Sequence, residues 1–272
     1  IARRYARPIQ LQVSMNPFEP EYAREHPGNK WRALAARFVI PRAECLIARS
    51  QHLAEVFEKR YRGIQARVTV LPLFRNLASF RDSAPAFDLH ERYPRLKFII
   101  LVISRMDTRS QIDRAVTVCI PILQQYPTIG LVIAGDGPLR RALEKKVSDA
   151  AVPEQVKFES NTDDLVSLMK SSNLFLNVGM DEEHDDLLAA AAAAGLPILT
   201  VASDMASALF EDGVSAFVCP EDDTVCLQAR IGEFLNDNQL RSAFSMNGRD
   251  QVFSLMEQDA GSYREKIIDS FE

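Results

Sequence analysis

The sequence predicts an α/β protein built on doubly wound parallel sheets. Two observations carry this prediction. Residues 97–104 and 129–134 are almost wholly apolar, which is typical of strands that helices cover on both faces. Each run is followed by a segment whose apolar residues recur at helical spacing, and this alternation repeats along the chain. Alternation of this kind brings strands together in parallel through helical crossovers.

The first 75 residues predict a smaller β-α-β-α-β unit. Residues 8–15 alternate apolar and polar side chains at period two, as expected of a strand. A helix is expected at 29–39, because apolar side chains recur there at helical spacing and Pro41 ends the run. A strand, a helix capped by Ser50 and a further strand complete the unit at 45–49, 50–60 and 68–71.

The second part of the chain predicts a larger sheet. A polar, irregular stretch from Asn76 to Pro94 is expected to link the two parts. Helices are expected at 112–123 and 139–147, and shorter strands separated by helices at 156–158, 174–176, 197–200 and 216–219. Residues 224–272 are expected to be nearly all helical, with a break at Gly261. We therefore expect domains at 1–79 and 80–257, and a final helix at 258–272.

Composition and charge narrow the class of protein. The 272 residues are 47% hydrophobic with a net charge of -5. A large core can form, and nucleic acid is not expected as a partner, since phosphate neutralisation needs a basic surface. No apolar run reaches the roughly 18 residues that span a bilayer, so a soluble cytoplasmic protein is expected. Position 1 is Ile, so we also expect that an amino-terminal part of the same protein precedes it.

Basic residues gather near the start of the chain. The simpler interpretation is a solvated charged face. The alternative is peripheral contact with the inner face of a membrane, as would suit a lipid-linked substrate. The residues concerned are Arg3, Arg4, Arg7, Lys30, Arg32, Arg37 and Arg42.

The cysteines predict the redox compartment. None of them forms a C-x-x-C pair, and most lie in apolar runs, so they are interpreted as buried free thiols in a reducing compartment. They are Cys45, Cys119, Cys219 and Cys226.

Candidate binding residues directly follow the predicted strands, because ligands of doubly wound sheets bind beyond the carboxyl ends of the strands. A glycine turn follows the strand 129–134 and precedes a helix, which predicts free backbone N-H groups near a bound phosphate. A tight strand-to-helix turn is the alternative. After the neighbouring strand, Ser104 precedes Arg105, whose guanidinium can clamp a diphosphate with two hydrogen bonds or be a plain surface group. The turn consists of Gly135, Asp136, Gly137 and Pro138.

An acidic run at 181–186 is expected to form a loop before an alanine-rich helix. Carboxylates at a helix start interact favourably with the helix dipole, so capping is the simpler interpretation. A cation site that uses His184 is less favoured, because adjacent ligands on one loop rarely complete a coordination shell. No metal is therefore expected.

In order and spacing, these segments resemble the retaining glycosyltransferases of family 4, which have the two-domain GT-B fold and use nucleotide-sugar donors. Ser104-Arg105-Met106 looks like the family's Gly-Arg-Leu segment, and residues 133–138 resemble its Val-Gly-Xaa-Gly-Pro turn. Residues 156–158, 188–200 and 212–220 resemble its Val-Xaa-Phe-Xaa-Gly, Glu-Ala-Met-Ala-Xaa-Gly-Xaa-Pro-Val and Asp-Gly to Val-Pro segments. The resemblance covers residues 45 to 257 or so.

The resemblance implies an activity and a donor site. The activity is retaining transfer of a sugar from a nucleotide diphosphate to a saccharide, lipid-linked or protein acceptor, with no cofactor besides the donor. Arg105 would stabilise the leaving diphosphate and Glu182 would contact the sugar, while the glycine turn approaches the donor. The remaining residues implied beside the donor are Ser104, Ser110, Phe158, Glu183, His184, Asp185 and Ala190.

Departures from the family pattern fall in that same donor site. Ser110 stands in place of a Lys, residues 183–185 replace Gly-Phe-Gly, and Ala190 replaces a second Glu. Acidic side chains in place of glycines repel a diphosphate. The alternative function is therefore a catalytically inactive homologue that acts as a binding or scaffolding subunit. The first 75 residues resemble only the end of the family's acceptor domain, and the last helix resembles the one that crosses back to it.

Overall fold

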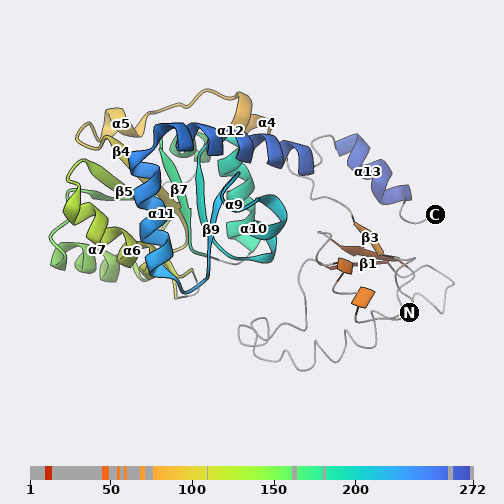
Figure 1. Cartoon of the computed structure of the whole chain (residues 1–272), viewed down its shortest axis with the longest axis horizontal. Helices are drawn as coiled ribbons and strands as arrows, with labels where there is room; N and C mark the ends of the chain where they lie inside the picture. The colour runs from red at the N-terminus through yellow and green to blue at the C-terminus, as the bar shows by residue number, and fades with distance from the viewer. Residues whose placement is uncertain are drawn as a thin grey trace. The chain divides into compact units, whose positions relative to one another are not determined.

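The computed structural model describes residues 10–13, 45–48, 54–55, 58–59, 68–70, 76–108, 110–160, 164–179, 182–256 and 260–269. The chain forms two compact units (Figure 1). Unit 1 comprises Ile1–Arg75 and Met256–Glu272, and unit 2 comprises Asn76–Leu255.

Unit 1 contains a parallel sheet of three strands in the order β1-β2-β3. The strands are β1 (Gln10–Val13), β2 (Cys45–Ala48) and β3 (Val68–Val70), which confirms the three strands predicted here. The last helix, α13 (Ala260–Asp269), belongs to the same unit. It begins at Ala260, one residue before the glycine at which a break was expected, whereas α12 ends at Leu255. The helix expected at 29–39 and the early basic residues lie outside the described residues.

Unit 2 is built on a parallel sheet of six strands in the order β6-β5-β4-β7-β8-β9. The chain runs outward from β4 to β6 and then returns to the other side of β4, so the strand order reverses between β4 and β7. This topology confirms the doubly wound α/β class. The strands are β4 (Phe98–Ile103), β5 (Ile129–Ala134), β6 (Val156–Glu159), β7 (Leu174–Asn177), β8 (Ile198–Val201) and β9 (Phe217–Cys219).

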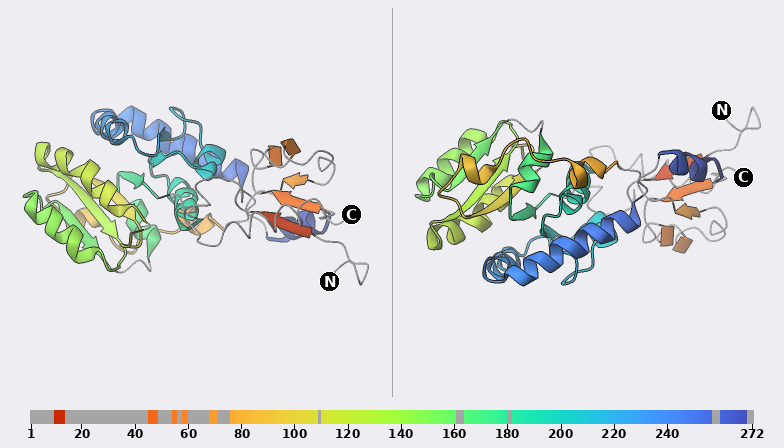
Figure 2. Two further views of the ribbon diagram at one scale, coloured as in Figure 1. Left: turned by 90° about the horizontal axis from the view of Figure 1, so that it is seen from below. Right: turned by 90° about the horizontal axis from the view of Figure 1, so that it is seen from above.

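Helices cover the sheet of unit 2 on both faces (Figure 2). One group, in which α6 contacts both others, consists of α6 (Ile112–Gln125), α7 (Arg140–Asp149) and α11 (Thr224–Asn236). In the second group α9 (Glu182–Ala193) contacts α4 (Ala78–Asp82), α10 (Asp204–Leu209) and α12 (Asn238–Leu255). Two short helices, α5 (Leu89–Arg92) and α8 (Leu165–Lys170), complete the unit.

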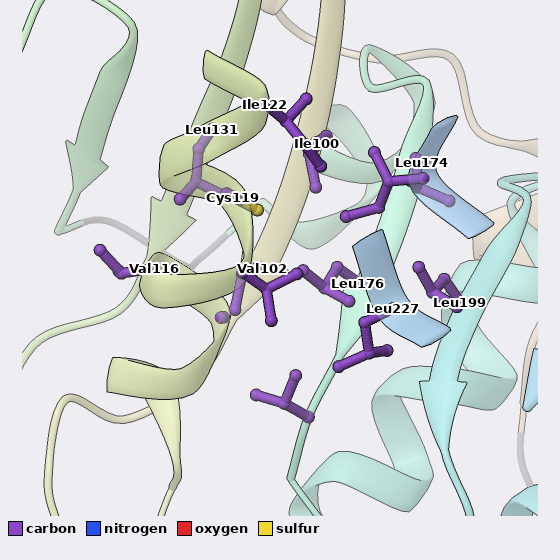
Figure 3. Packing of buried hydrophobic residues seen from close by; sticks show 14 of the residues in the cluster. Ile100, Val102, Val116, Cys119, Ile122, Leu131, Leu174, Leu176, Leu199 and Leu227 are labelled. Atoms are coloured by element: carbon purple, nitrogen blue, oxygen red, sulfur yellow. The ribbon is translucent and has the colours of Figure 1, made fainter. Parts of the chain in front are cut away.

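The burial of the strands of unit 2 explains why the sequence has nearly continuous apolar runs at β4 and β5. Strands β4 and β7 are central in the sheet, so most of their side chains are buried whichever face they point to. Helix α6 adds an apolar stripe because its buried residues recur at helical spacing. Figure 3 shows members of this cluster, among them Ile100, Val102, Val116, Cys119, Ile122, Leu174, Leu176, Leu199 and Leu227.

Two expectations about unit 2 are wrong. The acidic residues from Glu182 onward begin α9 instead of forming a loop, which suits carboxylates because the helix dipole is positive at that end. Cys219 and Cys226 form a disulfide, since the end of β9 and the first turn of α11 bring their Cα atoms to 5.9 Å. Cys119 is a buried free thiol as predicted. Among the described residues, no helix combines the length and the apolar character needed to cross a membrane.

Candidate functional site

The carboxyl ends of three strands meet at one edge of the sheet of unit 2. Ile103 at the end of β4 lies opposite Ala134 of β5, and Ala134 lies opposite Glu159 of β6. The residues that follow these strands therefore come together, beside the point where the strand order reverses. We call residues 104–107, 135–140 and 158–160 the carboxyl-edge cluster.

The glycine turn packs against the segment that follows β4. The Met106 amide donates to the Asp136 carbonyl over 3.0 Å, and the Leu139 amide donates to the Met106 carbonyl over 2.9 Å. Gly135 has a φ of 141°, and a Cβ atom there would lie 2.1 Å from the Ser104 carbonyl oxygen. Glycine is therefore required here by the close approach of two backbone segments.

Most amides of the turn already have acceptors within the protein. The Gly135 amide donates to the Glu159 carbonyl over 2.8 Å, and the Gly137 amide donates to the Asp136 carboxylate over 2.7 Å. The Leu139 amide is likewise bonded to the Met106 carbonyl. The prediction that this turn offers free backbone N-H groups is therefore wrong for the amides of Gly135, Gly137 and Leu139. The alternative prediction, a tight strand-to-helix turn, describes the segment. That this turn lies beside a bound nucleotide-sugar donor stays a prediction.

Arg105 is the exposed cation of the carboxyl-edge cluster. Its side chain is 71% exposed, and its Nε lies 3.5 Å from a carboxylate oxygen of Asp107. Ser104, in contrast, is buried, and its hydroxyl donates to the Arg105 carbonyl over 3.1 Å. The backbone of this segment is thus fixed while the guanidinium remains open to an anionic ligand.

Ser110 is turned into the protein. It is 2% exposed, its hydroxyl donates to the Asp107 carbonyl over 2.9 Å, and its amide donates to the Asp107 carboxylate over 3.2 Å. Asp107 therefore holds the Ser110 turn and also faces Arg105. The position where the family pattern has a Lys stabilises the local backbone and adds no positive charge.

Arg140 joins the cluster without having been predicted. It is the first residue of α7, and its guanidinium donates to the Ser160 hydroxyl over 2.5 Å and to the Phe158 carbonyl over 3.4 Å. The same group lies 5.7 Å from the centroid of the half-buried Phe158 ring. A cation at a helix amino terminus interacts unfavourably with the helix dipole. An arginine at the start of a predicted helix is therefore unusual, and this feature of the sequence could have indicated a role for Arg140.

Glu159 anchors the end of β6. Its carboxylate accepts hydrogen bonds from Arg92 over 2.9 Å and from the Tyr93 hydroxyl over 2.6 Å. Burial opposes ionisation of Glu159, but these two hydrogen bonds outweigh it and lower its pKa. Burial and the bond to Glu159 raise the pKa of Tyr93 to about 12. Because Gly135 donates to the Glu159 carbonyl, this anchor also supports the glycine turn.

The remaining predicted residues belong to α9, which follows β7 across the reversal point. The backbone of its first turns includes Glu182, Glu183, His184 and Asp185, whose side chains lie outside the description. Ala190 is 5% exposed and lies on the same helix. The structure therefore gathers Ser104, Arg105, the glycine turn and Phe158 at three neighbouring strand ends, and α9 starts after the strand next to them.

Fold and site together define a class. An exposed arginine follows β4 beside the reversal point, and a glycine turn follows the neighbouring β5, which is where doubly wound α/β proteins bind their ligands. Residues 90–251, more than half of the chain, match the family of glycosyl transferases group 1. The chain belongs to this family.

Curated relatives from three organisms match part of the chain. The gpi3 subunit of phosphatidylinositol N-acetylglucosaminyltransferase from Schizosaccharomyces pombe is 26% identical over 175 residues, which are 63% of this chain and 38% of the relative. N-acetyl-alpha-D-glucosaminyl L-malate synthase from Bacillus anthracis is 22% identical over 52% of this chain and 36% of its own length. The Vi polysaccharide biosynthesis protein VipC/TviE from Salmonella typhi is 27% identical over 39% of this chain. The matched region spans less than half of each relative.

Solved structures agree on the fold. Anabaena HepE, in complex with UDP and glucose, aligns with a TM-score of 0.78 and 18% identity over 99% of this chain and 72% of that protein. The C-terminal domain of a group 1 glycosyl transferase (LpcC) from Francisella tularensis aligns with a TM-score of 0.58 and 16% identity, over 66% of this chain and 97% of that domain. The chain therefore has the Rossmann-like α/β architecture of the GT-B fold.

Proposed function

We propose that this chain is part of a glycosyltransferase that moves a sugar from a nucleotide-diphosphate donor to an acceptor and retains the configuration at C1. The observation that carries the proposal is the exposed guanidinium of Arg105 at the end of β4, beside the glycine turn. Membership of the group 1 family supports it. So do the complexes of HepE, a protein of the same fold, with UDP and with UDP-glucose.

Arg105 acts on the leaving group in this proposal. The bond between the sugar C1 and the diphosphate oxygen breaks, and the oxygen of an acceptor hydroxyl bonds to C1 while its proton passes to the departing diphosphate. Negative charge grows on the departing diphosphate, and a fixed guanidinium stabilises that charge. Glu182, at the start of α9, contacts the sugar. The scheme requires no metal, because the guanidinium supplies the neutralising charge.

The nucleobase is assigned to the end of β6. The half-buried ring of Phe158 and the guanidinium of Arg140 offer planar surfaces on which a base can stack. Arg140 is held in place by Ser160 and by Glu144, which accepts from its Nε over 3.0 Å. Because both partners are fixed before binding, little side-chain entropy is lost when a base arrives.

The first donors to test follow from the relatives. By name, the Schizosaccharomyces pombe and Bacillus anthracis proteins handle N-acetylglucosaminyl groups, and HepE binds UDP-glucose. UDP-N-acetylglucosamine and UDP-glucose are therefore the donors of choice. The acceptor is a saccharide, a lipid-linked group or a protein. If the acceptor is linked to a lipid, we propose that the arginines near the start of the chain contact the membrane surface.

A second function is favoured by Ala190 and Ser110. The family pattern has Glu and Lys at these positions, whereas here one side chain is a buried methyl group and the other a hydroxyl bonded to Asp107. Loss of a charge-assisted contact to the donor weakens binding by about 2 kcal/mol. A homologue without turnover, serving as a binding or scaffolding subunit, is therefore the competing proposal.

Isothermal titration of the chain with UDP, GDP, UDP-glucose and UDP-N-acetylglucosamine tests the donor site. We expect saturable binding of one nucleotide that Arg105→Ala abolishes. Arg95→Ala is the matched control, because Arg95 is also exposed but precedes β4 at the opposite edge of the sheet. Equal loss in both variants, or no binding by a folded chain, would overturn the donor assignment. Binding without transfer to any acceptor would favour the scaffolding subunit.

A further inference from the structure

The disulfide between Cys219 and Cys226 lies at the same edge of the sheet as the candidate site. Cys219 ends β9, and Cys226 lies in the first turn of α11, 7 positions later. The bond therefore closes the loop that joins a strand end to the following helix. The donor scheme makes no use of this bond.

Hydrogen bonds shape this loop independently of the sulfur atoms. The Asp223 amide donates to the Pro220 carbonyl over 3.1 Å, and the Asp223 carboxylate accepts from the Cys226 amide over 2.8 Å. The Leu227 amide also donates to the Asp223 carbonyl, over 3.2 Å. These bonds keep the two cysteines adjacent when the disulfide is reduced, so that it can form again without refolding.

The two cysteine residues differ in their exposure to solvent. Cys219 is fully buried, whereas Cys226 is half-buried beside Val225, which is 73% exposed. An external thiolate therefore reaches Cys226 first. Cys119 behaves differently, because it is fully buried and burial raises the pKa of its thiol to about 12.

Arg114 connects the loop to the candidate site. Its guanidinium donates to the Glu221 carbonyl and, over 2.7 Å, to the Asp222 carboxylate, both inside the loop that the disulfide closes. Arg114 is in the first turn of α6, which begins directly after the segment that carries Arg105 and Ser110. The first turn of α6 is thus tied to the loop by a hydrogen bond and by an ion pair between the half-buried Arg114 and the exposed Asp222.

We propose that Cys219 and Cys226 form a reversible thiol-disulfide site that sets the rigidity of this loop and, through Arg114, of the start of α6. In reduction, the thiolate of a small thiol bonds to the Cys226 sulfur, and the Cys219 sulfur leaves with the electron pair and takes up a proton. A second thiol then attacks the mixed disulfide, releases the Cys226 thiol and leaves as the oxidised disulfide of the reagent. The reducing equivalents come from two thiols of the reductant.

Differential alkylation followed by peptide mass spectrometry tests the chemistry. In the chain treated with a mild thiol oxidant, we expect Cys219 and Cys226 to resist alkylation and to appear as a linked peptide. After dithiothreitol under native conditions, the linked peptide should disappear and the half-buried Cys226 should accept one label, while the fully buried Cys219 and Cys119 accept a label only after denaturation. A pair that stays alkylatable after oxidation, or that dithiothreitol cannot reduce without denaturant, would overturn the proposal.

Hydrogen exchange tests the connection to α6. Residues 112–118 should exchange severalfold faster in the reduced chain and in Cys226→Ser, while residues 140–149 of α7 serve as the internal reference. Cys119→Ser is the control that must leave the redox difference intact. Identical exchange in both forms would refute the role of Arg114.

The expected effect on nucleotide affinity, a weaker Kd for UDP after reduction, rests on the proposed function. If UDP binds neither form, the donor assignment fails, and the alkylation and exchange results still decide the redox proposal. If UDP binds both forms equally well, the pair does not act on the donor site.

Discussion

Gln111, directly before α6, combines two unfavourable features. Its φ of 53° and ψ of 20° lie in the left-handed region, which costs a non-glycine residue about 1 to 2 kcal/mol. Its Oε1 atom is buried and has no hydrogen-bond partner, and an unsatisfied buried acceptor costs about 1 to 3 kcal/mol. Glycine at this position removes both costs.

Two losses offset that gain in Gln111→Gly. The extra backbone freedom of glycine in the unfolded chain costs about 0.5 to 1 kcal/mol. Loss of the half-buried side-chain methylenes costs about 1 kcal/mol more. We therefore expect Gln111→Gly to raise the free energy of unfolding by about 2 kcal/mol, within a range of about 0 to 3.5. Urea unfolding followed by circular dichroism at pH 7 measures it.

Two further variants separate the contributions. Gln111→Ala removes the unsatisfied oxygen but keeps the backbone strain, so its stability should lie about 1 kcal/mol below that of Gln111→Gly. Ala151→Gly relieves strain alone, because the exposed Ala151 has a φ of 59° at the end of α7. It should stabilise the chain by up to about 1 kcal/mol. A Gln111→Gly chain less stable than both wild type and Gln111→Ala would refute the reasoning.

Two other substitutions probe the anchor of β6 and the glycine turn. Tyr93→Phe, which removes the donor to Glu159, should destabilise by about 1 kcal/mol at pH 7. In the folded chain the pKa of Tyr93 is about 12, above its ordinary value of 10.0. The stability difference between wild type and Tyr93→Phe should therefore be complete below pH 10 and shrink as the pH rises towards 12. Urea unfolding of both chains from pH 7 to 11 measures this difference, and a constant value would contradict the prediction. Gly135→Ala should cost about 3 kcal/mol or more, since its Cβ meets the Ser104 carbonyl. Gly213→Ala, with a φ of 77° and nothing within 4 Å, should cost only about 1 kcal/mol; the reverse order of melting temperatures would contradict this.

Much of the fold could be predicted because its signals are local. The apolar runs at 98–103 and 129–134 are strands covered on both faces, and apart from the half-buried Phe98 all of their residues are buried. The helical spacing from Ile112 onward reports the stripe that faces the sheet. The acidic start of α9 was misinterpreted because its polarity resembles a loop, and only the dipole argument favours a helix there.

The candidate site was predicted in part. Residues that follow strands, such as Arg105 and the glycine turn, could be found from topology alone. The roles of individual groups could not. The amide of Gly135 is occupied by Glu159, the hydroxyl of Ser110 by Asp107, and each contact depends on which loops lie side by side.

The sequence by itself determined the α/β class, the strands and the strand ends where a ligand would bind, because periodicity and apolar runs are properties of neighbouring residues. Only the tertiary structure decided the contacts between distant segments. Arg92 with Glu159, Arg140 with Ser160, and Arg114 with Asp222 come from parts of the chain that strand register brings together. The disulfide of Cys219 and Cys226 belongs to the same group, since a turn between strand and helix, and not the spacing of the cysteines, sets their distance.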